Sequence, residues 1–340
     1  MSNEPVDAHP APWPEALTPV FDRFKTAEFT SLTPSGQPIT YPLTPYLCAD
    51  GLALEVSTGL TYPAKADRVR TQPKVSLLYS EPMGSGIAGA PTILVLGHGI
   101  VQSADLQANT DRFIRSSIAK NPEANRSMTP RLVARLGWYF VRLYVRVVPQ
   151  DIYWWPAGQS DAPPEHWHAT ALGELPTSDP PPAGKSPPPW AAKPGDWHKS
   201  AAHAVQHLGL PVVTSLNADG YPIATRATGM RLTPEGFTLD LPKGALAPPT
   251  GRACLTFHIH SETFLSQENM TFIGTAHAEE TTVQFRVSRR LGNWSLRGGG
   301  LRAAWDFLGK GRFLRKRLAQ EAARYGQPVP VVRLPQPDKS

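Results

Sequence analysis

Short apolar runs separated by turn-forming residues fill the chain between residues 29 and 102. The segment TSLTPSGQPITYPL, which begins at Thr30, places two such runs around Pro-Ser-Gly and predicts a β-hairpin. Residues 52–58 alternate apolar and polar positions, and residues 74–80 and 92–101 are further runs of strand-forming residues. The pattern therefore predicts a series of short strands.

Helical spacing is confined to two places in this half of the chain. Residues 64–72, AKADRVRTQ, predict one short helix between two strands. Residues 106–121 carry apolar side chains at helical spacing, at Leu106, Phe113, Ile114 and Ile118. Residues 138–149, WYFVRLYVRVVP, predict a long closing strand. Many short strands with few helices indicate a small antiparallel barrel.

The first hairpin recurs in VTSLNADGYPIA, which begins at Val213. Six residues match at a constant offset of 184: Thr30, Ser31, Leu32, Gly36, Pro38 and Ile39 correspond to Thr214, Ser215, Leu216, Gly220, Pro222 and Ile223. DGLALEVSTG at Asp50 matches EGFTLDLPKG at Glu235, and ILVLGHGIVQ at Ile93 resembles MTFIGTAHAE at Met270. Blocks that recur in the same order indicate an internal repeat.

A fourth block extends the match toward the end of the chain, where VVPQ at Val147 lines up with RLPQ at Arg333. The two copies are therefore expected to span residues 15–158 and 196–337. Residues 159–195 between them are rich in proline, which resists packing and favours an extended linker. The repeat by itself predicts a pseudo-twofold axis within one chain.

Composition agrees with a folded protein and excludes several classes. Hydrophobic residues make up 41% of the chain and charged residues 18%, and the net charge of +6 is too small to indicate nucleic-acid binding. Two cysteines exclude a disulfide scaffold and a four-cysteine zinc site. No signal peptide or membrane-spanning run is expected, and the chain is expected to be cytoplasmic.

The order of these elements resembles the split β-barrel of the pyridoxamine 5′-phosphate oxidase-like superfamily, which includes the flavin reductase-like FMN-binding proteins. The resemblance is carried by three places in the first copy. These are Ser57, Thr58, Lys65, Pro73 and Val75 around the short helix, then Gly97 in the next strand, and Pro149 followed by Trp154 and Trp155 in the closing strand. It covers nearly all of the first copy and mainly the strands of the second.

The resemblance implies a mainly β fold with short helices: two tandem antiparallel split β-barrels that form an intramolecular pseudo-dimer. Such barrels commonly hold FMN in the groove between two copies, and related branches hold the deazaflavin coenzyme F-420 or, less often, heme. The implied cofactor-binding residues are Ser57, Thr58, Gly59, Lys65, Arg68, Trp154 and Trp155. The alternative interpretation of the two tryptophans is ordinary packing at a barrel edge.

The residues around the short helix support a phosphate site on their own. A flavin phosphate is a dianion that needs a cation and neutral donors. The segment STGLTYPAKADRVR offers the hydroxyls of Ser57 and Thr58, the Gly59 backbone, and the cations Lys65 and Arg68. Lys65 falls in the first helical turn, where the helix dipole disfavours a cation unless an anion is bound. The alternative is a solvated basic turn.

The second copy lacks this helix. Sixteen residues separate Gly59 from Val75, whereas nine separate Gly244 from Ala253 at the matching positions. Lys243 and Arg252 remain as alternative phosphate partners there. The sequence therefore predicts one cofactor per chain, gripped by the first copy, with the second copy as the opposite wall.

Other candidates are weaker. His258 and His260 share a strand face but lack a third ligand, so no metal site is expected; His98 is a candidate polar contact, and Cys48 and Cys254 are expected to be buried. Residues 301–326 predict a basic helix with Arg312, Arg315, Lys316 and Arg317. It is expected to cover the second barrel, with lipid or nucleic-acid binding, or a place beside the cofactor, as alternatives.

Two classes of function follow. One is an oxidoreductase in which FMN or deazaflavin carries hydride, so that no catalytic side chain is identified. The alternative is a non-catalytic binder of flavin or heme. True pyridoxamine phosphate oxidase activity is not expected, because the Arg-x-His pattern of that branch is missing after Trp155. The substrate is not identified, and the internal pseudo-dimer permits a monomer.

Overall fold

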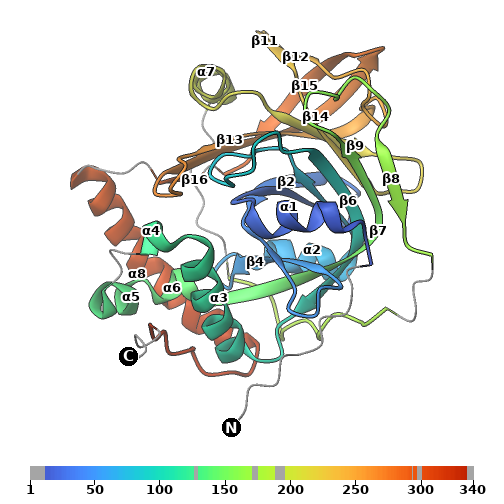
Figure 1. Cartoon of the computed structure of the whole chain (residues 1–340). Helices are drawn as coiled ribbons and strands as arrows, with labels where there is room; N and C mark the ends of the chain where they lie inside the picture. The colour runs from blue at the N-terminus through green and yellow to red at the C-terminus, as the bar shows by residue number, and fades with distance from the viewer. Residues whose placement is uncertain are drawn as a thin grey trace.

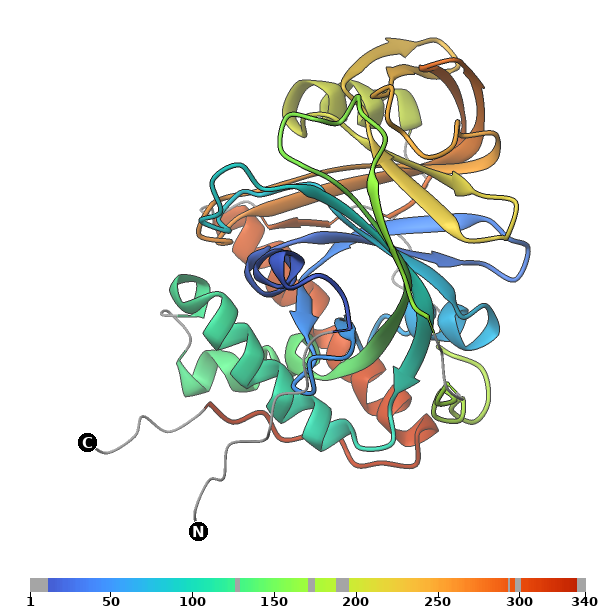
Figure 2. The same cartoon turned by 45° about the vertical axis from the view of Figure 1, so that its right-hand side comes forward.

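The computed structural model describes residues 12–125, 129–170, 175–187, 196–292, 294–296 and 301–334. Two curled antiparallel sheets form the body of the molecule, the first drawn in blue and green and the second in yellow and orange (Figures 1 and 2). Most of the described helices lie around the first sheet, whereas α7 (Trp197–His207) packs on the second.

The first sheet has the strand order β2-β1-β5-β6-β7-β4-β3, with β8 added beside β7. Its strands are β1 (Ala27–Leu32), β2 (Pro38–Leu43), β3 (Pro45–Leu47), β4 (Leu54–Gly59), β5 (Lys74–Tyr79), β6 (Thr92–Gln102), β7 (Arg142–Trp155) and β8 (Glu165–His168). The helices of this half are α1 (Thr18–Arg23), preceded by a 3-10 turn at Glu15–Leu17, α2 (Ala64–Thr71), α3 (Leu106–Lys120), α4 (Pro122–Asn125), α5 (Pro130–Arg135) and α6 (Gly137–Phe140).

The second sheet repeats this order as β10-β9-β13-β14-β15-β12-β11, with β16 beside β14. Its strands are β9 (Val212–Leu216), β10 (Pro222–Arg226), β11 (Gly229–Thr233), β12 (Gly236–Asp240), β13 (Gly251–His260), β14 (Gln267–Glu279), β15 (Thr282–Arg290) and β16 (Trp294–Leu296). Each main strand has its counterpart eight places later. The topology confirms the tandem split-barrel fold that the resemblance implied.

Even the irregularities of the two sheets repeat. The pairing of β6 with β7 shifts between Leu96 and Gly97, and that of β14 with β15 shifts between Ile273 and Gly274. A Cβ atom on Gly97 would lie 2.6 Å from the carbonyl oxygen of Val148, so the bulge leaves no room for a side chain there. The glycine found in the sequence therefore has a steric role.

The two barrels differ in what connects their strands. No described helix lies between β12 and β13, as the shorter sequence predicted. In the first barrel α3 to α6 separate β6 from β7, whereas β15 follows β14 through a turn at Glu280 and Thr281. The predicted match of VVPQ with RLPQ is therefore wrong, because the counterpart of β7 is β15. Residues 335 and 336 of that block lie outside the described residues.

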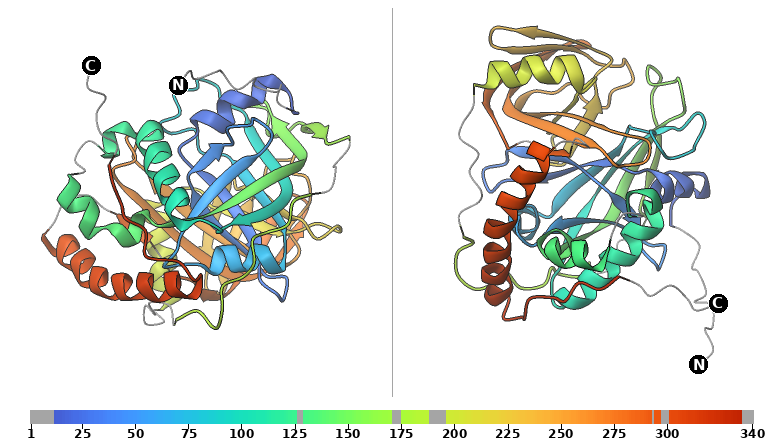
Figure 3. Two further views of the ribbon diagram at one scale, coloured as in Figure 1. Left: turned by 90° about the horizontal axis from the view of Figure 1, so that it is seen from below. Right: turned by 90° about the vertical axis from the view of Figure 1, so that its left-hand side faces the viewer.

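The C-terminal helix α8 (Leu301–Arg324) returns to the first barrel instead of covering the second. Its Leu314, Leu318 and Ala322 are buried in the hydrophobic core of the first barrel, and the helix runs along that side of the molecule (Figure 3). The expectation that it covers the second barrel is wrong. The division into folding units at residues 15–158, 159–195 and 196–337 remains a prediction, although α8 packs in the core of the first barrel.

No described helix is long and apolar enough to span a membrane.

Residues 175–187 of the linker are bound to the first barrel and to α8. Asp179 accepts hydrogen bonds from the backbone N–H groups of Ser103 and Ala104, at 2.5 and 2.7 Å. Ser186 donates to the buried carboxylate of Glu321 in α8. This stretch of the linker therefore follows a defined path between β6 and α8.

The barrels pack through β1, β2, β5 and β6 on one side and β9, β10, β13 and β14 on the other. Lys74 Nζ donates to the carbonyl of Asp219 at 2.5 Å, and Arg252 donates to the carbonyl of Ser35. Lys74 and Arg252 occupy equivalent strand positions, and Ser35 and Asp219 equivalent turn positions. These two contacts are related by the pseudo-twofold axis and confirm the internal pseudo-dimer.

A buried charge network joins the barrels at their centre. Glu28 in β1 is fully buried, and its Oε1 lies 2.6 Å from Arg226 Nη2 and 2.6 Å from His258 Nε2, both in the second barrel. Burial alone would raise the pKa of Glu28. The positive charge of Arg226 and the hydrogen bond from His258 outweigh it and hold that pKa below its usual value.

Removal of Glu28 is expected to weaken the interface strongly. In Glu28→Ala, the buried His258 and the partly buried Arg226 lose the carboxylate that they bind, so the free energy of unfolding is expected to fall by about 3–5 kcal/mol. Urea unfolding followed by circular dichroism measures this loss. Glu235→Ala breaks the exposed ion pair with Arg286 and should cost less than about 1 kcal/mol. Equal losses in the two variants would show that Glu28 is not a central contact.

Candidate functional site

The predicted phosphate-binding segment lies where β4 ends and α2 begins. A tight turn joins them, in which the Tyr62 N–H donates to the Gly59 carbonyl at 2.8 Å and the Leu60 N–H to the Val141 carbonyl at 2.9 Å. Pro63 precedes α2 and Lys65 lies in its first turn, as the sequence predicted. The turn therefore brings Gly59 and Lys65 to the same end of the barrel.

Three cations converge at this turn, and we call Lys65, Arg68 and Arg142 the cation cluster. Burial and the charges of Arg68 and Arg142 lower the pKa of Lys65 to about 7. Arg142 begins β7 and is the register partner of Gly59. No ion pair joins any of the three cations to a carboxylate of the described residues. Positive charge is thus gathered without a fixed counter-charge.

Aromatic rings hold the cations in place where acids do not. Lys65 Nζ lies 4.4 Å from the centre of the Tyr41 ring. The guanidinium of Arg142 lies 4.2 Å from the Phe113 ring and 4.4 Å from the Tyr139 ring. Cation–π contacts of this kind orient a cation and leave its hydrogen-bond donors available.

Several polar atoms at the turn are buried and have no hydrogen-bond partner in the described structure: Arg68 Nη2, Arg142 Nε and Thr61 Oγ1. Arg68 uses its Nε to donate to Ser31 Oγ at 2.9 Å. A Cβ atom on Gly59 would lie 3.6 Å from Thr61 Oγ1 and 3.7 Å from Arg142 Nη1. Buried polar atoms without partners are rare in folded proteins, and those of Thr61 and Arg142 belong to side chains that lie beside this glycine.

The two hydroxyls named from the sequence lie differently from each other. Ser57 and Thr58 are neighbours on β4, so their side chains point to opposite faces of the sheet. Thr58 Oγ1 donates to the Tyr62 carbonyl at 3.2 Å and thereby braces the turn. Ser57 is buried on the strand face that it shares with Gly59. Thr61 is a hydroxyl at the cluster that the sequence argument missed.

The second barrel approaches the cation cluster from the other side of the interface. Tyr41 packs with Ile39, Cys254, Ile273 and Leu291, of which the last three belong to the second barrel. Burial raises the pKa of Tyr41, whereas the charges of Arg68 and Arg289 oppose that shift. The expectation that the second copy supplies the opposite wall remains a proposal, and Arg289 is a cation of the second barrel whose charge reaches Tyr41.

Trp155 lies at the other, pseudo-symmetric edge of the interface. Its Nε1 donates to the carbonyl of Gly244 at 3.1 Å, and Gly244 is the counterpart of Gly59 in the second copy. Trp155 packs there with residues of both barrels, among them Leu78, Ile223 and Leu246. Trp154 packs on the core of the first barrel. The structure therefore does not bring Trp155 together with Lys65.

The loop after β7 fills the edge at Trp155. The Gly244 N–H donates to the Ser160 carbonyl at 3.1 Å, and the Lys243 N–H donates to Asp161 at 2.9 Å. A Cβ atom on Gly244 would lie 2.0 Å from the carbonyl oxygen of Ala162. Arg252, the other alternative phosphate partner, binds the turn at Ser35. This edge is occupied by the chain itself.

The remaining candidates have structural contacts. His258 belongs to the Glu28 network, and His260 Nδ1 bonds to the Ser261 carbonyl at 3.0 Å. His98 is half-buried in β6, and burial lowers its pKa. Cys48 and Cys254 are buried free thiols, as expected. On α8, Arg312, Arg315 and Lys316 are exposed, whereas Arg317 is buried and pairs with Glu321 at 3.4 Å.

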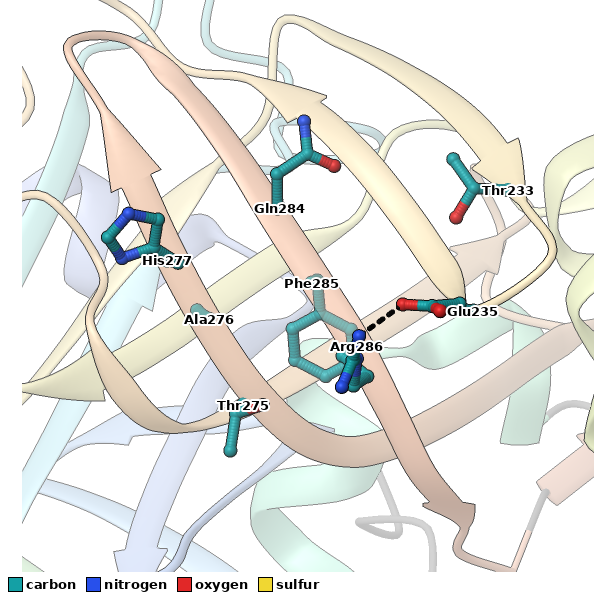
Figure 4. Close-up of a pocket in the computed structure, with 8 residues that line it drawn as sticks. All are labelled: Thr233, Glu235, Thr275, Ala276, His277, Gln284, Phe285 and Arg286. Atoms are coloured by element: carbon teal, nitrogen blue, oxygen red, sulfur yellow. Dashed lines mark hydrogen bonds and ion pairs between the residues drawn. The ribbon is translucent and has the colours of Figure 1, made fainter.

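Two cavities of the described structure lie away from the cation cluster. One, of about 430 Å³, lies on the second barrel beside the Glu235–Arg286 pair (Figure 4). The other, of about 510 Å³, lies between α1, β3 and α3 and is lined by Lys25, Glu55 and Lys120 among others. Burial lowers the pKa of Lys120 to about 7, and its ammonium donates to the Pro45 carbonyl. Neither cavity contains a residue of the cluster.

No family model matches the chain, and no curated protein matches it in sequence. Solved structures match it in fold. A conserved hypothetical protein from Mycobacterium tuberculosis is 18% identical, with 51% of this chain and 99% of that chain covered and a TM-score of 0.33. A pyridoxamine 5′-phosphate oxidase-related, FMN-binding protein from Nostoc punctiforme is 16% identical, covering 43% and 84%, with a TM-score of 0.31.

A third match is a protein named F420 reductase, which is 13% identical, with 41% of this chain and 98% of that chain covered and a TM-score of 0.30. Each of the three therefore covers about half of this chain at most. At these identities the likeness is one of fold alone.

The chemistry of the cation cluster fits a bound phosphate. A phosphate dianion would give Lys65 the counter-charge that its surroundings lack, and it accepts hydrogen bonds from guanidinium and hydroxyl donors. Arg142 is the residue that the sequence argument missed. Its pairing with Gly59 depends on the register of β4 with β7, which no local pattern reveals.

The cost of the unpaired lysine is expected to appear in the pH dependence of stability. The folded pKa of Lys65 is about 7 and the unfolded value is the ordinary 10.5. Between these values the unfolded chain binds more protons, so the free energy of unfolding of the wild type rises with pH. Lys65→Met removes this titration. The variant is therefore expected to exceed the wild type in stability most at pH 7 and below, and less as the pH rises toward 10.

Urea unfolding between pH 6 and 9.5 in a phosphate-free buffer tests this expectation. The matched control is Lys316→Met, which removes an exposed lysine from α8 and should show no pH-dependent difference from the wild type. A Lys65→Met difference that is constant across this range would mean that Lys65 keeps an ordinary pKa in the folded protein.

Proposed function

We propose that the chain binds a phosphate-bearing flavin, either FMN or the deazaflavin coenzyme F-420, at the cation cluster, and that it acts as an oxidoreductase. The observation that carries the proposal is the convergence of Lys65, Arg68 and Arg142 at the turn after β4, where Arg142 pairs with Gly59, with no carboxylate ion-pair partner among the described residues. Three cations held together unpaired are costly, and a bound anion offsets that cost.

The roles of the individual residues follow from their contacts. Arg68 Nη2, Arg142 and Thr61 Oγ1 would donate hydrogen bonds to phosphate oxygens, because these atoms are buried without other partners. Lys65 would take up a proton on binding, since an adjacent anion raises the pKa that burial and the two arginines lower. Gly59 would leave room for the phosphate, because a side chain there would point at Thr61 and Arg142.

When bound, the isoalloxazine or deazaflavin ring supplies the hydride chemistry, and the protein supplies binding, orientation and electrostatics. A positive cluster at the phosphate end fixes one end of such a cofactor in the interface, where Tyr41 and Leu291 from the two barrels meet. The sequence and the described residues identify no catalytic acid or base, and the substrate class is not part of the proposal.

A non-catalytic flavin binder is the second candidate. The observation that favours it is the composition of the cluster, which contains no histidine or carboxylate to exchange a proton with a substrate. Reduction by NAD(P)H separates the two candidates. Bleaching of the bound flavin, followed by reoxidation when an acceptor is added, supports the oxidoreductase, whereas a bound flavin that no nicotinamide reduces supports the binder.

Lys65→Met is expected to weaken FMN binding by about tenfold to a hundredfold. The lost charge-assisted contact contributes roughly 1.5–3 kcal/mol, and each 1.4 kcal/mol changes the dissociation constant about tenfold. Titration of FMN fluorescence at fixed pH and salt measures the change. Riboflavin, which lacks the phosphate, should bind the wild type more weakly than FMN does and should bind both proteins alike.

Lys316→Met is the matched control and should leave both affinities unchanged, because this lysine is exposed on α8. Gly59→Ala tests the same site without changing its charge and should weaken FMN binding while the protein stays folded. An FMN affinity that is equal in the wild type and Lys65→Met would remove the phosphate site from the proposal. Equal losses in Lys65→Met and Lys316→Met would indicate diffuse electrostatic attraction instead.

One flavin per chain is expected, because the pseudo-symmetric edge is filled by Trp155 and by the loop that binds Gly244. Flavin absorbance at saturation, compared with the protein concentration, gives the stoichiometry. Two equivalents per chain would mean that the loop leaves its place and that the second edge also binds. The absorption spectrum of the purified protein distinguishes FMN from a deazaflavin.

A further inference from the structure

One further group of side chains lies together on the outer face of β7 and β8. These antiparallel strands pair Asp151 with His168 and Tyr153 with His166. Residues two apart on a strand point to the same face, so both histidines project from β8 beside Asp151. One possible ligand atom from each of Asp151, His166 and His168 lies within 4.8 Å of the other two, and among the described residues no other group of three histidine, cysteine or acidic side chains meets this distance.

The three side chains are arranged around one point. Asp151 Oδ1 lies 2.8 Å from His166 Nε2 and 2.8 Å from His168 Nδ1. Ligands bound tetrahedrally at the usual zinc distances of about 2.0–2.2 Å are separated by about 3.4 Å. Each imidazole nitrogen would therefore have to move about 0.6 Å away from Asp151 Oδ1 to receive a metal ion at these distances.

The strands hold the ligands in place from the opposite face. Trp167, between the two histidines, packs on the core of the first barrel, and its partner Ile152 is fully buried. The His166 ring stacks on Tyr153, with ring centres 4.3 Å apart and planes inclined by 5°. A short strand with one anchored residue and two outward histidines is a rigid pair of ligands.

We propose that Asp151, His166 and His168 bind a divalent transition metal ion such as Zn²⁺. Two imidazole nitrogens and one carboxylate oxygen match the preferences of Zn²⁺ and its neighbours and exclude the all-oxygen sites of Mg²⁺ and Ca²⁺. The histidines are half to two-thirds exposed, with side-chain values of 43% and 63%. The solvent side would leave the fourth position open to water or another ligand.

The second barrel adds charge near this site. Burial is the main cause of the raised pKa values of Tyr153 and Tyr221, and the negative charges of Asp151 and Asp219 raise both pKa values further. Asp219 therefore lies close to the same two tyrosines as Asp151. Lys74 is the nearby cation, with its Nζ 4.9 Å from the centre of the Tyr221 ring and bonded to the Asp219 carbonyl. The metal site therefore lies beside the contact between the barrels and is separate from the cation cluster.

The proposal is tested with tag-free protein, first stripped with a chelator and dialysed, by isothermal titration with Zn²⁺ and by the visible spectrum with Co²⁺. One ion per chain with a dissociation constant in the micromolar range or below is expected, together with the intense visible bands of four-coordinate Co²⁺. His166→Ala, His168→Ala and Asp151→Asn should each weaken binding by at least about tenfold. Far-ultraviolet circular dichroism checks that each variant is folded.

His277→Ala is the matched control, because His277 is also exposed and faces a carboxylate, Glu279, at 3.9 Å but has no second histidine. It should leave the affinity for Zn²⁺ unchanged. The proposal is overturned if the wild type binds Zn²⁺ no more tightly than about 1 mM, or if the His168→Ala and His277→Ala variants lose affinity equally. Either result would leave the three side chains as a surface hydrogen-bond group. FMN binding is not needed for any of these measurements.

Discussion

The contact between the two barrels is the constraint on which the rest of the molecule depends. Each sheet buries one face inside its own barrel and uses β1, β2, β5 and β6, or their counterparts, to meet the other barrel. Glu28 is fully buried, so its charge depends on Arg226 and His258 across the interface. The two edges of the interface, where a ligand could enter, are set by this packing.

The two edges are no longer equivalent, although the strands that form them are. One keeps α2 and gathers cations around Gly59, and the other has lost the helix and is filled by Trp155 and the loop after β7. Unpaired cations reduce stability and filled edges increase it. The asymmetry agrees with the proposal of one binding site at the first edge and one structural contact at the second.

The sequence predicted the repeated strands, the hairpins and the missing helix, because each of these is a local pattern of apolar residues, glycine and proline. It failed where the answer depends on distant pairing. Arg142 joins Lys65 through the register of β7 with β4, and Trp155 is carried away from Lys65 by the same strand. His166 and His168 fall in the segment predicted to be an extended linker, and only the pairing of β8 with β7 brings them to Asp151.

The return of α8 to the first barrel has a consequence for the order in which the chain can fold. Leu314, Leu318 and Ala322 complete a core whose other members lie between residues 13 and 152. During synthesis the second barrel therefore leaves the ribosome before the first can be completed. Until α8 docks, part of the apolar core of the first barrel stays exposed to solvent. Newly made chains are therefore expected to be prone to aggregation at this stage. The two barrels are arranged in tandem in the sequence, but because α8 completes the first barrel, the second barrel is an insertion within the first folding unit.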